Sequence, residues 1–244
     1  MIRPVNHERP LVLASASPRR FELFGLLGIP FSTAQAGTDE RARPQEPPTR
    51  AVQRLAHEKA AAVAGRLDGR PTIVVGADTV VVLDGRILGK PADAAEAFAM
   101  LRALRGRRHH VYTALSLLPL PGGAPLACLA HTDVPMRAYS EAEIERYVAS
   151  GDPFDKAGAY AIQNPAFRPV PRLDGCYANV MGLPLCHLVT QLRRLGVHPP
   201  ADIPRACQAA TGYRCSVFDS ILDPHARPCG DERLVPTRPA GENR

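Results

Sequence analysis

A long apolar run at residues 72–83 limits the fold of this 244-residue chain more than any other feature. It is rich in β-branched residues and is interrupted only by Gly76, Ala77, Asp78 and Thr79. Continuous rather than alternating apolar character is typical of a strand covered on both faces, as in the central strands of α/β proteins. We therefore predict a central strand at residues 72–83.

Asp78 stands in the middle of this predicted strand. An ionised carboxylate is costly to take out of water unless it has a partner. The small residues before it suit a strand that admits a ligand against its backbone. Two interpretations remain open at this point: a surface aspartate at a bulge or strand end, or a functional carboxylate.

Further strands and helices are predicted on both sides of this run. The patterns indicate strands at residues 11–14, 31–34, 111–118, 126–138 and 176–181, a hairpin arm after Asp84-Gly85, and helices at 18–27, 49–64, 94–104, 141–149 and 184–195. Strands that alternate with helices and then form an antiparallel pair predict an α/β fold with a mixed central sheet flanked by helices.

The segment at residues 15–20 joins the first strand to the first helix. Ser17 followed by Pro18 is typical of an N-cap with proline at the first helical position. A helix start also presents backbone N–H groups to an anion. Arg19 and Arg20 oppose the helix dipole there, unless an anion lies in front of them. Two exposed arginines on a basic surface would give the same pattern.

Lysine is rare in this chain. Of its 30 basic residues only Lys59, Lys90 and Lys156 are lysines. An ammonium is a compact charge that a guanidinium fork does not replace, so these three could mark functional positions, although chance retention explains them equally well. Lys59 follows the inner stripe of its predicted helix through Val52 and Leu55, which indicates either a snorkelling side chain or one directed into a site. We favour the site.

Composition excludes several classes of protein. The net charge of +6 and pI near 9.2 favour anionic partners. Aromatic content of 5% without tryptophan argues against a platform for single-stranded nucleic acid. No apolar run reaches the roughly 18 residues of a membrane span, and the N-terminal segment lacks a signal peptide's apolar centre. The six scattered cysteines predict reduced thiols in a cytoplasmic protein.

The character of the chain changes near residue 199. We predict a main domain at residues 1–198 and an irregular, proline-rich extension at residues 199–244. The extension carries Cys207, Cys215, Cys229 and His225, which could fill a tetrahedral zinc site, but there is no CxxC pair. Unpaired thiols are the alternative that we favour.

Short motifs in the main domain resemble those of the Maf family of nucleoside triphosphate pyrophosphatases, in the same order. They are SASPRR at 15–20, DE at 39–40, EKA at 58–60, GADTV at 76–80, GKP at 89–91, DKAGAY at 155–160 with IQ at 162–163, and MGLP at 181–184. The resemblance spans roughly residues 11–196 and excludes the extension. It implies a Maf/ITPase-like fold.

The resemblance also implies an activity and a set of site residues. It implies a divalent-metal-dependent enzyme, with Mg²⁺ or Mn²⁺, that converts a nucleoside triphosphate to the monophosphate and pyrophosphate. The implied catalytic residues are Asp78, Glu40, Lys59 and Lys90, with Asp78 and Glu40 also holding the metal. The resemblance ties Arg19, Thr79 and Gln163 to the choice of substrate, and we add Ser15, Ser17, Arg20 and Lys156 as candidate substrate-binding residues.

The motif at residues 15–20, Asp78-Thr79 and Ile162-Gln163 are together similar to the branch of the family that prefers dTTP and UTP over methylated guanine nucleotides. Asn164-Pro165 departs from the glycine that many relatives have after the glutamine. The sequence does not separate a role of Asp78 as general base from one as metal ligand.

Two other functions are compatible with parts of this pattern. One is a nucleotide-binding regulator of cell division that acts by protein contact, although all the charged motif positions are filled. The other is a basic nucleic-acid-binding protein, against which the few aromatic residues and the lack of a known binding module count. The resemblance implies a homodimer, and we expect no nucleic-acid or membrane partner.

Overall fold

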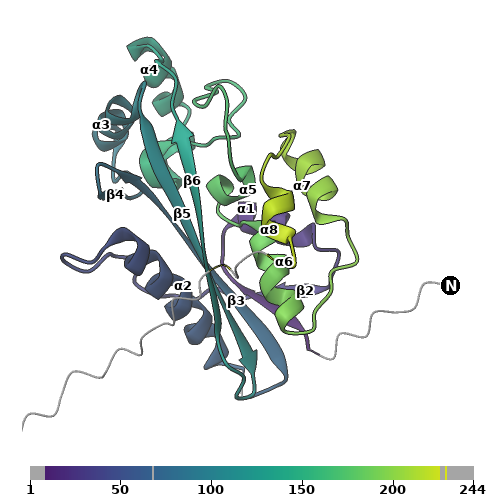
Figure 1. Cartoon of the computed structure of the whole chain (residues 1–244). Coiled ribbons are helices and arrows are strands. Elements are labelled where there is room, and N and C mark those ends of the chain that lie inside the picture. The colour runs from purple at the N-terminus through teal and green to yellow at the C-terminus, as the bar shows by residue number, and fades with distance from the viewer. Residues whose placement is uncertain (1–8, 68, 226–228, 230–244) are drawn as a thin grey trace, which may run out of the picture.

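The computed structural model describes residues 9–67, 69–225 and 229. Its centre is a six-stranded mixed sheet with the strand order β2-β1-β3-β5-β6, in which β4 pairs with β3 (Figure 1). The strands are β1 (Leu11–Ala14), β2 (Phe31–Thr33), β3 (Thr72–Leu83), β4 (Arg86–Leu88), β5 (Arg108–Leu120) and β6 (Leu126–Pro135). β1, β2 and β3 are parallel, whereas β4, β5 and β6 pair antiparallel. The predicted mixed α/β fold is confirmed.

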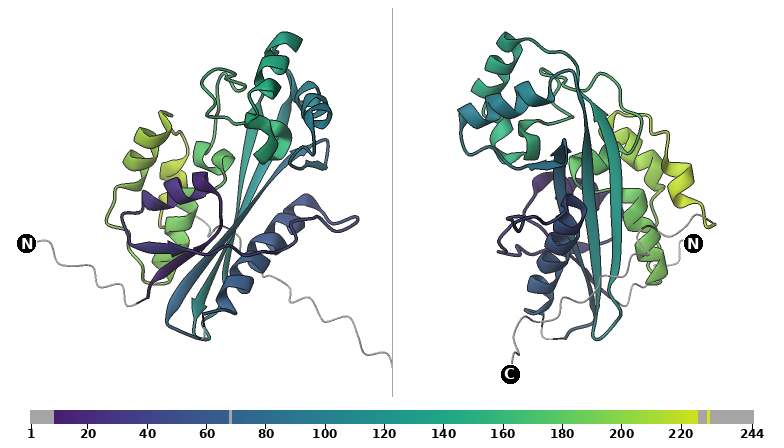
Figure 2. Two further views of the ribbon diagram at one scale, coloured as in Figure 1. Left: turned by 180° about the vertical axis from the view of Figure 1, so that it is seen from behind. Right: turned by 60° about the vertical axis from the view of Figure 1, so that its left-hand side comes forward.

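Helices cover both faces of this sheet. They are α1 (Pro18–Gly25), α2 (Pro48–Ala64), α3 (Ala94–Leu104), α4 (Glu141–Ala149), α5 (Tyr177–Met181), α6 (Leu185–Arg194), α7 (Ile203–Thr211) and α8 (Phe218–Leu222), with 3₁₀ turns at Asp152–Asp155 and Ala157–Ala159. α2 packs on one face, and α1, α5 and α6 pack on the other (Figures 1 and 2). α3 and α4 pack in a cluster with Val111 of β5 and Val134 of β6. No helix among the described residues has the length and apolarity to cross a membrane.

Several helices begin at a residue whose side chain caps the first turn. Ser17 accepts a hydrogen bond from the amide of Arg20, and Ser140 forms a full capping box with Glu143. The helix predicted at residues 49–64 begins one residue earlier, at Pro48, and its N-cap Pro47 makes no side-chain hydrogen bond. Proline at the first helical positions supplies the required backbone angle there instead.

The segment predicted as a last strand, residues 176–181, is the helix α5. Its buried polar residue Asn179 explains the difference, because the side-chain amide donates to the Val111 carbonyl at 3.1 Å and to Thr132 Oγ1 at 2.9 Å. These bonds dock the helix against β5 and β6. Gly182 ends it at a φ of 107°, which glycine adopts without strain. Six residues are too short a run for periodicity to separate the two structures.

The described part of the extension contains α7 and α8, which its weak periodicity did not reveal. Both helices pack on the cluster around α6 through Ile203, Cys207 and Ile221, among other residues. The described residues of the extension therefore add to the core on that face of the sheet.

The prediction that the cysteines are all reduced is wrong. Cys128 of β6 forms a disulfide with Cys229, which lies 101 residues later in the chain. Cysteine spacing could not show this pairing, because it depends on how the extension returns to the sheet. Cys229 is therefore not available as a zinc ligand beside Cys207, Cys215 and His225. Cys207 and Cys215 are free thiols, as we expected.

Close contact between α2 and β3 at Gly76 fixes the distance between the helix and the sheet. A Cβ atom at Gly76 would lie 2.2 Å from the Ala56 carbonyl oxygen and 2.9 Å from the Ala60 Cβ. Only glycine allows the helix to approach the strand this closely. The contact sets the position of the α2 turn that carries Lys59.

We expect Gly76→Ala to destabilise the protein, because either the helix or the strand must shift to admit the methyl group. The loss in free energy of unfolding is about 1–3 kcal/mol, the usual cost of overpacking. Urea unfolding measures it. Gly25→Ala is the control, since its Cβ would meet nothing within 4 Å. Equal midpoints for the two variants would contradict the close approach.

Candidate active site

The site lies where one side of β3 is left without a strand. β1 pairs with β3 only as far as Gly76, and β4 begins to pair with it at Val81. In the described part of the chain no strand covers residues 77–80 on this side. Asp78 and Thr79 therefore lie at an opening in the middle of the sheet, which explains how a central strand can carry a carboxylate.

A cavity of about 420 Å³ fills this opening. Its volume lies within the usual range of small-molecule sites, roughly 300–1,000 Å³. Every residue that the sequence predicted for the site lines it: Ser15, Ser17, Arg19, Arg20, Glu40, Lys59, Asp78, Thr79, Lys90, Lys156 and Gln163. The structure thus brings together segments from most of the length of the main domain, and the roles of the individual residues stay predictions.

Lys59 is the central cation of the cavity. Its Nζ lies 2.6 Å from Asp78 Oδ1 and 2.7 Å from Glu40 Oε1. Lys59 and Asp78 are both buried, with exposed fractions of 5% and 6%. One ammonium therefore holds the two carboxylates together, and Lys59 reaches into the site rather than towards solvent.

Glu40 links this pair to the mouth of the cavity. Lys90 Nζ lies 3.7 Å from Glu40 Oε2, and both side chains are more than half exposed. Burial alone would raise the pKa of Glu40, but the hydrogen bond and charge of Lys59, with Lys90 and Arg20, bring the pKa below its usual value. Glu40 is therefore a carboxylate, ready to accept a cation.

Arg20 is held in the wall of the cavity by a chain of hydrogen bonds. Its Nε donates to the Gly182 carbonyl at 2.8 Å, and its Nη2 donates to Thr79 Oγ1 at 3.0 Å. Thr79 Oγ1 in turn lies 2.9 Å from Thr113 Oγ1, which donates to the Asn179 carbonyl. Burial lowers the pKa of Arg20, whereas Asp78 and Glu40 act in the opposite direction. The guanidinium is thus fixed between β3 and the end of α5.

Arg19 and Lys156, two further cations that line the cavity, are both paired with Asp155. Arg19 Nη1 lies 3.2 Å from Asp155 Oδ2, and Lys156 Nζ lies 2.5 Å from Asp155 Oδ1 and 2.9 Å from Asp152 Oδ1. The Ser17 amide donates to Ser15 Oγ at 3.2 Å, which closes the loop before α1 on itself. The Ser17 amide is thus already engaged within its own loop.

Sequence reasoning missed the residues that support this wall. Thr113 and Asn179 are buried and hold Thr79 in place, and Asp155 pairs with both Arg19 and Lys156. A polar residue inside an apolar strand, such as Thr113, was the available signal. Asn164 accepts hydrogen bonds from the amides of residues 166 and 167, so Asn164-Pro165 forms a turn next to the exposed Gln163.

The donor set suits a hard divalent cation. Mg²⁺ is usually bound by one or two carboxylates together with water and substrate phosphate oxygens. Asp78 and Glu40 offer such a pair, and they already share one positive charge at 2.6 and 2.7 Å. These residues fit the metal that the resemblance implies.

Comparison with known proteins finds similar chains along most of the sequence. The chain is 47% identical over 188 residues to the dTTP/UTP pyrophosphatase of Pelotomaculum thermopropionicum, an alignment that covers 77% of this chain and 97% of the relative. It is 48% identical over 190 residues to the dTTP/UTP pyrophosphatase of Hahella chejuensis, covering 78% and 94%.

The alignment with a solved dITP/XTP pyrophosphatase from Mycobacterium abscessus covers 53% of this chain and 75% of that protein's chain, with 17% identity and a TM-score of 0.35. A likeness of this size carries no information on function.

The family described as Maf-like protein matches residues 10–195, which are most of the chain and contain every residue of the cavity described above. This chain belongs to the Maf family.

Proposed function

We propose that this chain hydrolyses nucleoside triphosphates, with dTTP and UTP as preferred substrates, to the monophosphate and pyrophosphate. The observation that carries the proposal is the cavity in which Lys59 joins Asp78 and Glu40, surrounded by Arg19, Arg20 and other cations. The names of the two relatives above support the choice of nucleotide.

The chemistry needs charge neutralisation, an in-line geometry and an activated water more than it needs covalent help. Lys59, Lys90 and Arg19 would bind the phosphate oxygens from different sides. Asp78 would orient the attacking water or accept its proton, from a fixed position beside Lys59. Arg20 would hold Thr79 and the C-terminal end of α5 in position around the substrate.

A divalent metal, with Mg²⁺ as our choice, would be held by Asp78 and Glu40. When bound, it would neutralise charge on the phosphates and polarise the bond to be broken. Lys59 would then give up part of its contact with the two carboxylates and turn towards the phosphates, since its ammonium lies against both of them in the cavity.

The test is a panel of canonical and modified nucleoside triphosphates incubated with the purified chain and Mg²⁺. We expect pyrophosphate and monophosphate from dTTP and UTP, and no turnover after removal of metal with EDTA until Mg²⁺ is restored in excess. Absence of pyrophosphate from every nucleotide would contradict the proposal and favour a regulator that acts by contact. Release of orthophosphate instead would show that a different bond is broken.

Gln163 is our candidate for recognition of the base, because one amide offers both a donor and an acceptor to a pyrimidine edge. It lies on the exposed rim of the cavity. We expect Gln163→Ala to reduce the preference for UTP over a purine nucleotide by roughly tenfold, the value of one or two neutral hydrogen bonds. The ratio of kcat/KM for the two substrates measures this. An unchanged ratio with normal turnover would remove Gln163 from base selection.

The rest of the biological setting is part of the same proposal. Residues 1–198 would form the catalytic domain, and residues 199–244 an extension to it. We place the enzyme in the cytoplasm, as a homodimer without nucleic-acid or membrane partners, where it would remove unwanted pyrimidine nucleotides. The Cys128–Cys229 disulfide is unusual for that compartment.

A further inference from the structure

A second cluster of metal-binding side chains lies on β5 and β6, outside the cavity. It consists of His110, His131 and Asp133, and these residues form the only group of three histidine, cysteine, aspartate or glutamate ligands within 4.8 Å of one another among the described residues. None of the three lines the cavity at the open side of β3. The proposed pyrophosphatase reaction makes no use of them.

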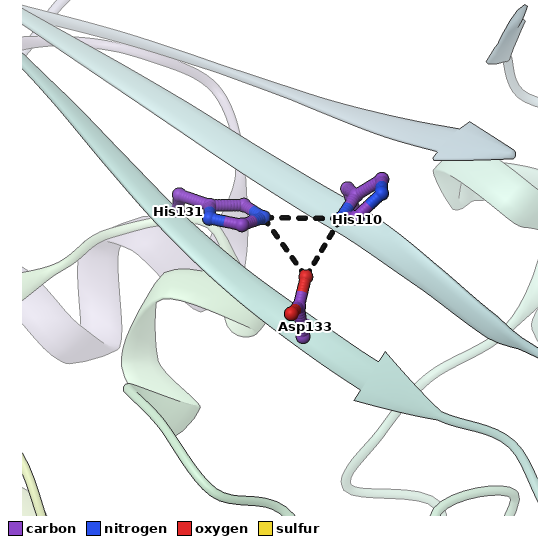
Figure 3. A group of neighbouring side chains, drawn as sticks. All are labelled: His110, His131 and Asp133. Atoms are coloured by element: carbon purple, nitrogen blue, oxygen red, sulfur yellow. Dashed lines mark hydrogen bonds and ion pairs between the residues drawn. The ribbon is translucent and has the colours of Figure 1, made fainter. Parts of the chain in front are cut away.

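The register of the strands places the three side chains on one face of the sheet. His110 lies directly opposite Asp133, and His131 lies opposite Tyr112, two residues along each strand. Residues two apart on a strand point to the same side, and opposite partners have their Cβ atoms about 5 Å apart. Figure 3 shows the two imidazole rings and the carboxylate pointing toward one another.

The ligand atoms converge on one point. His110 Nδ1 lies 2.6 Å from Asp133 Oδ1 and 3.1 Å from His131 Nε2, and His131 Nε2 lies 3.0 Å from the same Asp133 oxygen (Figure 3). In tetrahedral geometry, atoms bound to a zinc-sized cation at about 2.0–2.2 Å would be roughly 3.3–3.6 Å apart. To hold an ion, the two contacts of His131 would lengthen by roughly 0.2–0.6 Å and the contact between His110 and Asp133 by roughly 0.7–1.0 Å.

The surroundings hold the ligands in this arrangement. The Tyr112 ring stacks on the His131 ring with centroids 4.7 Å apart and an angle of 17° between the planes. The side chains of His110, His131 and Asp133 are each between 40% and 44% exposed, so an ion can reach them from solvent. The backbone beneath is a regular antiparallel ladder, which makes the spacing of the ligands rigid.

The geometry points to a binding site for a divalent transition-metal ion of the zinc class, held by His110 Nδ1, His131 Nε2 and Asp133 Oδ1. Two imidazoles and one carboxylate favour such ions over Mg²⁺, which prefers oxygen ligands alone. Three protein ligands leave further positions open to water. Because β6 lies at the edge of the sheet, a bound ion would also clamp this edge strand to β5.

Cobalt binding to the full-length protein tests the site. The titration contains excess Mg²⁺, which occupies sites built from oxygen ligands. Visible absorption then reports Co²⁺ that is coordinated by imidazole, and the absence of a near-ultraviolet band excludes thiolate ligands. We expect one equivalent of Co²⁺ to bind the wild type and to be displaced by Zn²⁺. His110→Ala and Asp133→Asn should each weaken binding at least ~100-fold, since loss of even an outer partner costs 10–100-fold.

His198→Ala is the matched control, because His198 is exposed and lies outside the cluster. It should bind Co²⁺ like the wild type. A thermal melt provides a second readout: Zn²⁺ should raise the Tm of the wild type and of His198→Ala but not of Asp133→Asn, a nearly isosteric change that keeps the fold. Equal Co²⁺ affinity in all four proteins, or no binding to the wild type, would show that the cluster is only a hydrogen-bonded network.

Discussion

Asp78→Asn should lose most of the turnover of dTTP while it keeps the fold. Removal of a general base typically costs about 10²–10⁴-fold in rate. Asparagine has nearly the same shape, and Lys59 keeps Glu40 as a charged partner at 2.7 Å. Steady-state pyrophosphate release measures kcat, and circular dichroism with urea unfolding verifies the fold.

The control for this change is Asp84→Asn at the turn after the same strand. Asp84 is exposed, pairs with Arg107 on the surface, and has a φ of 51°, which asparagine tolerates. It does not line the cavity, so its turnover should equal that of the wild type. If Asp78→Asn retained the rate of this control, Asp78 would not be the base, and its part in the reaction would reduce to positioning.

Lys59→Met should show the largest effect on stability. The buried carboxylate of Asp78 would lose its ammonium at 2.6 Å, and removal of one member of a buried ion pair typically costs about 3–5 kcal/mol. Urea unfolding gives the change. Lys90→Met is the matched control for stability: it removes the same charge from the same Glu40, but Lys90 is exposed, so the cost should stay below about 1 kcal/mol.

Lys59→Arg separates the need for an ammonium from the need for a charge. A guanidinium fork is broader and is fixed in shape, so it cannot take the narrow position between Asp78 and Glu40. We expect this variant to fold but to lose activity. Full activity in Lys59→Arg would contradict our explanation of why this arginine-rich chain has a lysine at this position.

The sequence predicted most of the sheet and the helix starts, because local patterns decide them. β3 is largely apolar because both of its faces are covered, and the caps at Ser17, Asp93 and Ser140 satisfy helix amides in their own turn. The site residues were identified through the family motifs that contain them, and not through local patterns alone. The structure then placed them around one cavity.

Long-range packing set the limit of prediction. Helix α5 is decided by bonds from Asn179 to β5 and β6, and the disulfide joins residues 101 positions apart. The cluster of His110, His131 and Asp133 depends on the register between two strands, which residue spacing within one segment does not give. The same holds for the support of Arg20 by Gly182.

A crystal structure of Asp78→Asn with dTTP and Mg²⁺ tests the central claim most directly. The triphosphate should lie in the cavity between the loop at residues 15–20 and the side chains of Lys59 and Lys90, with the metal next to Glu40 and position 78. A nucleotide bound at another surface, with this cavity filled only by solvent, would contradict it.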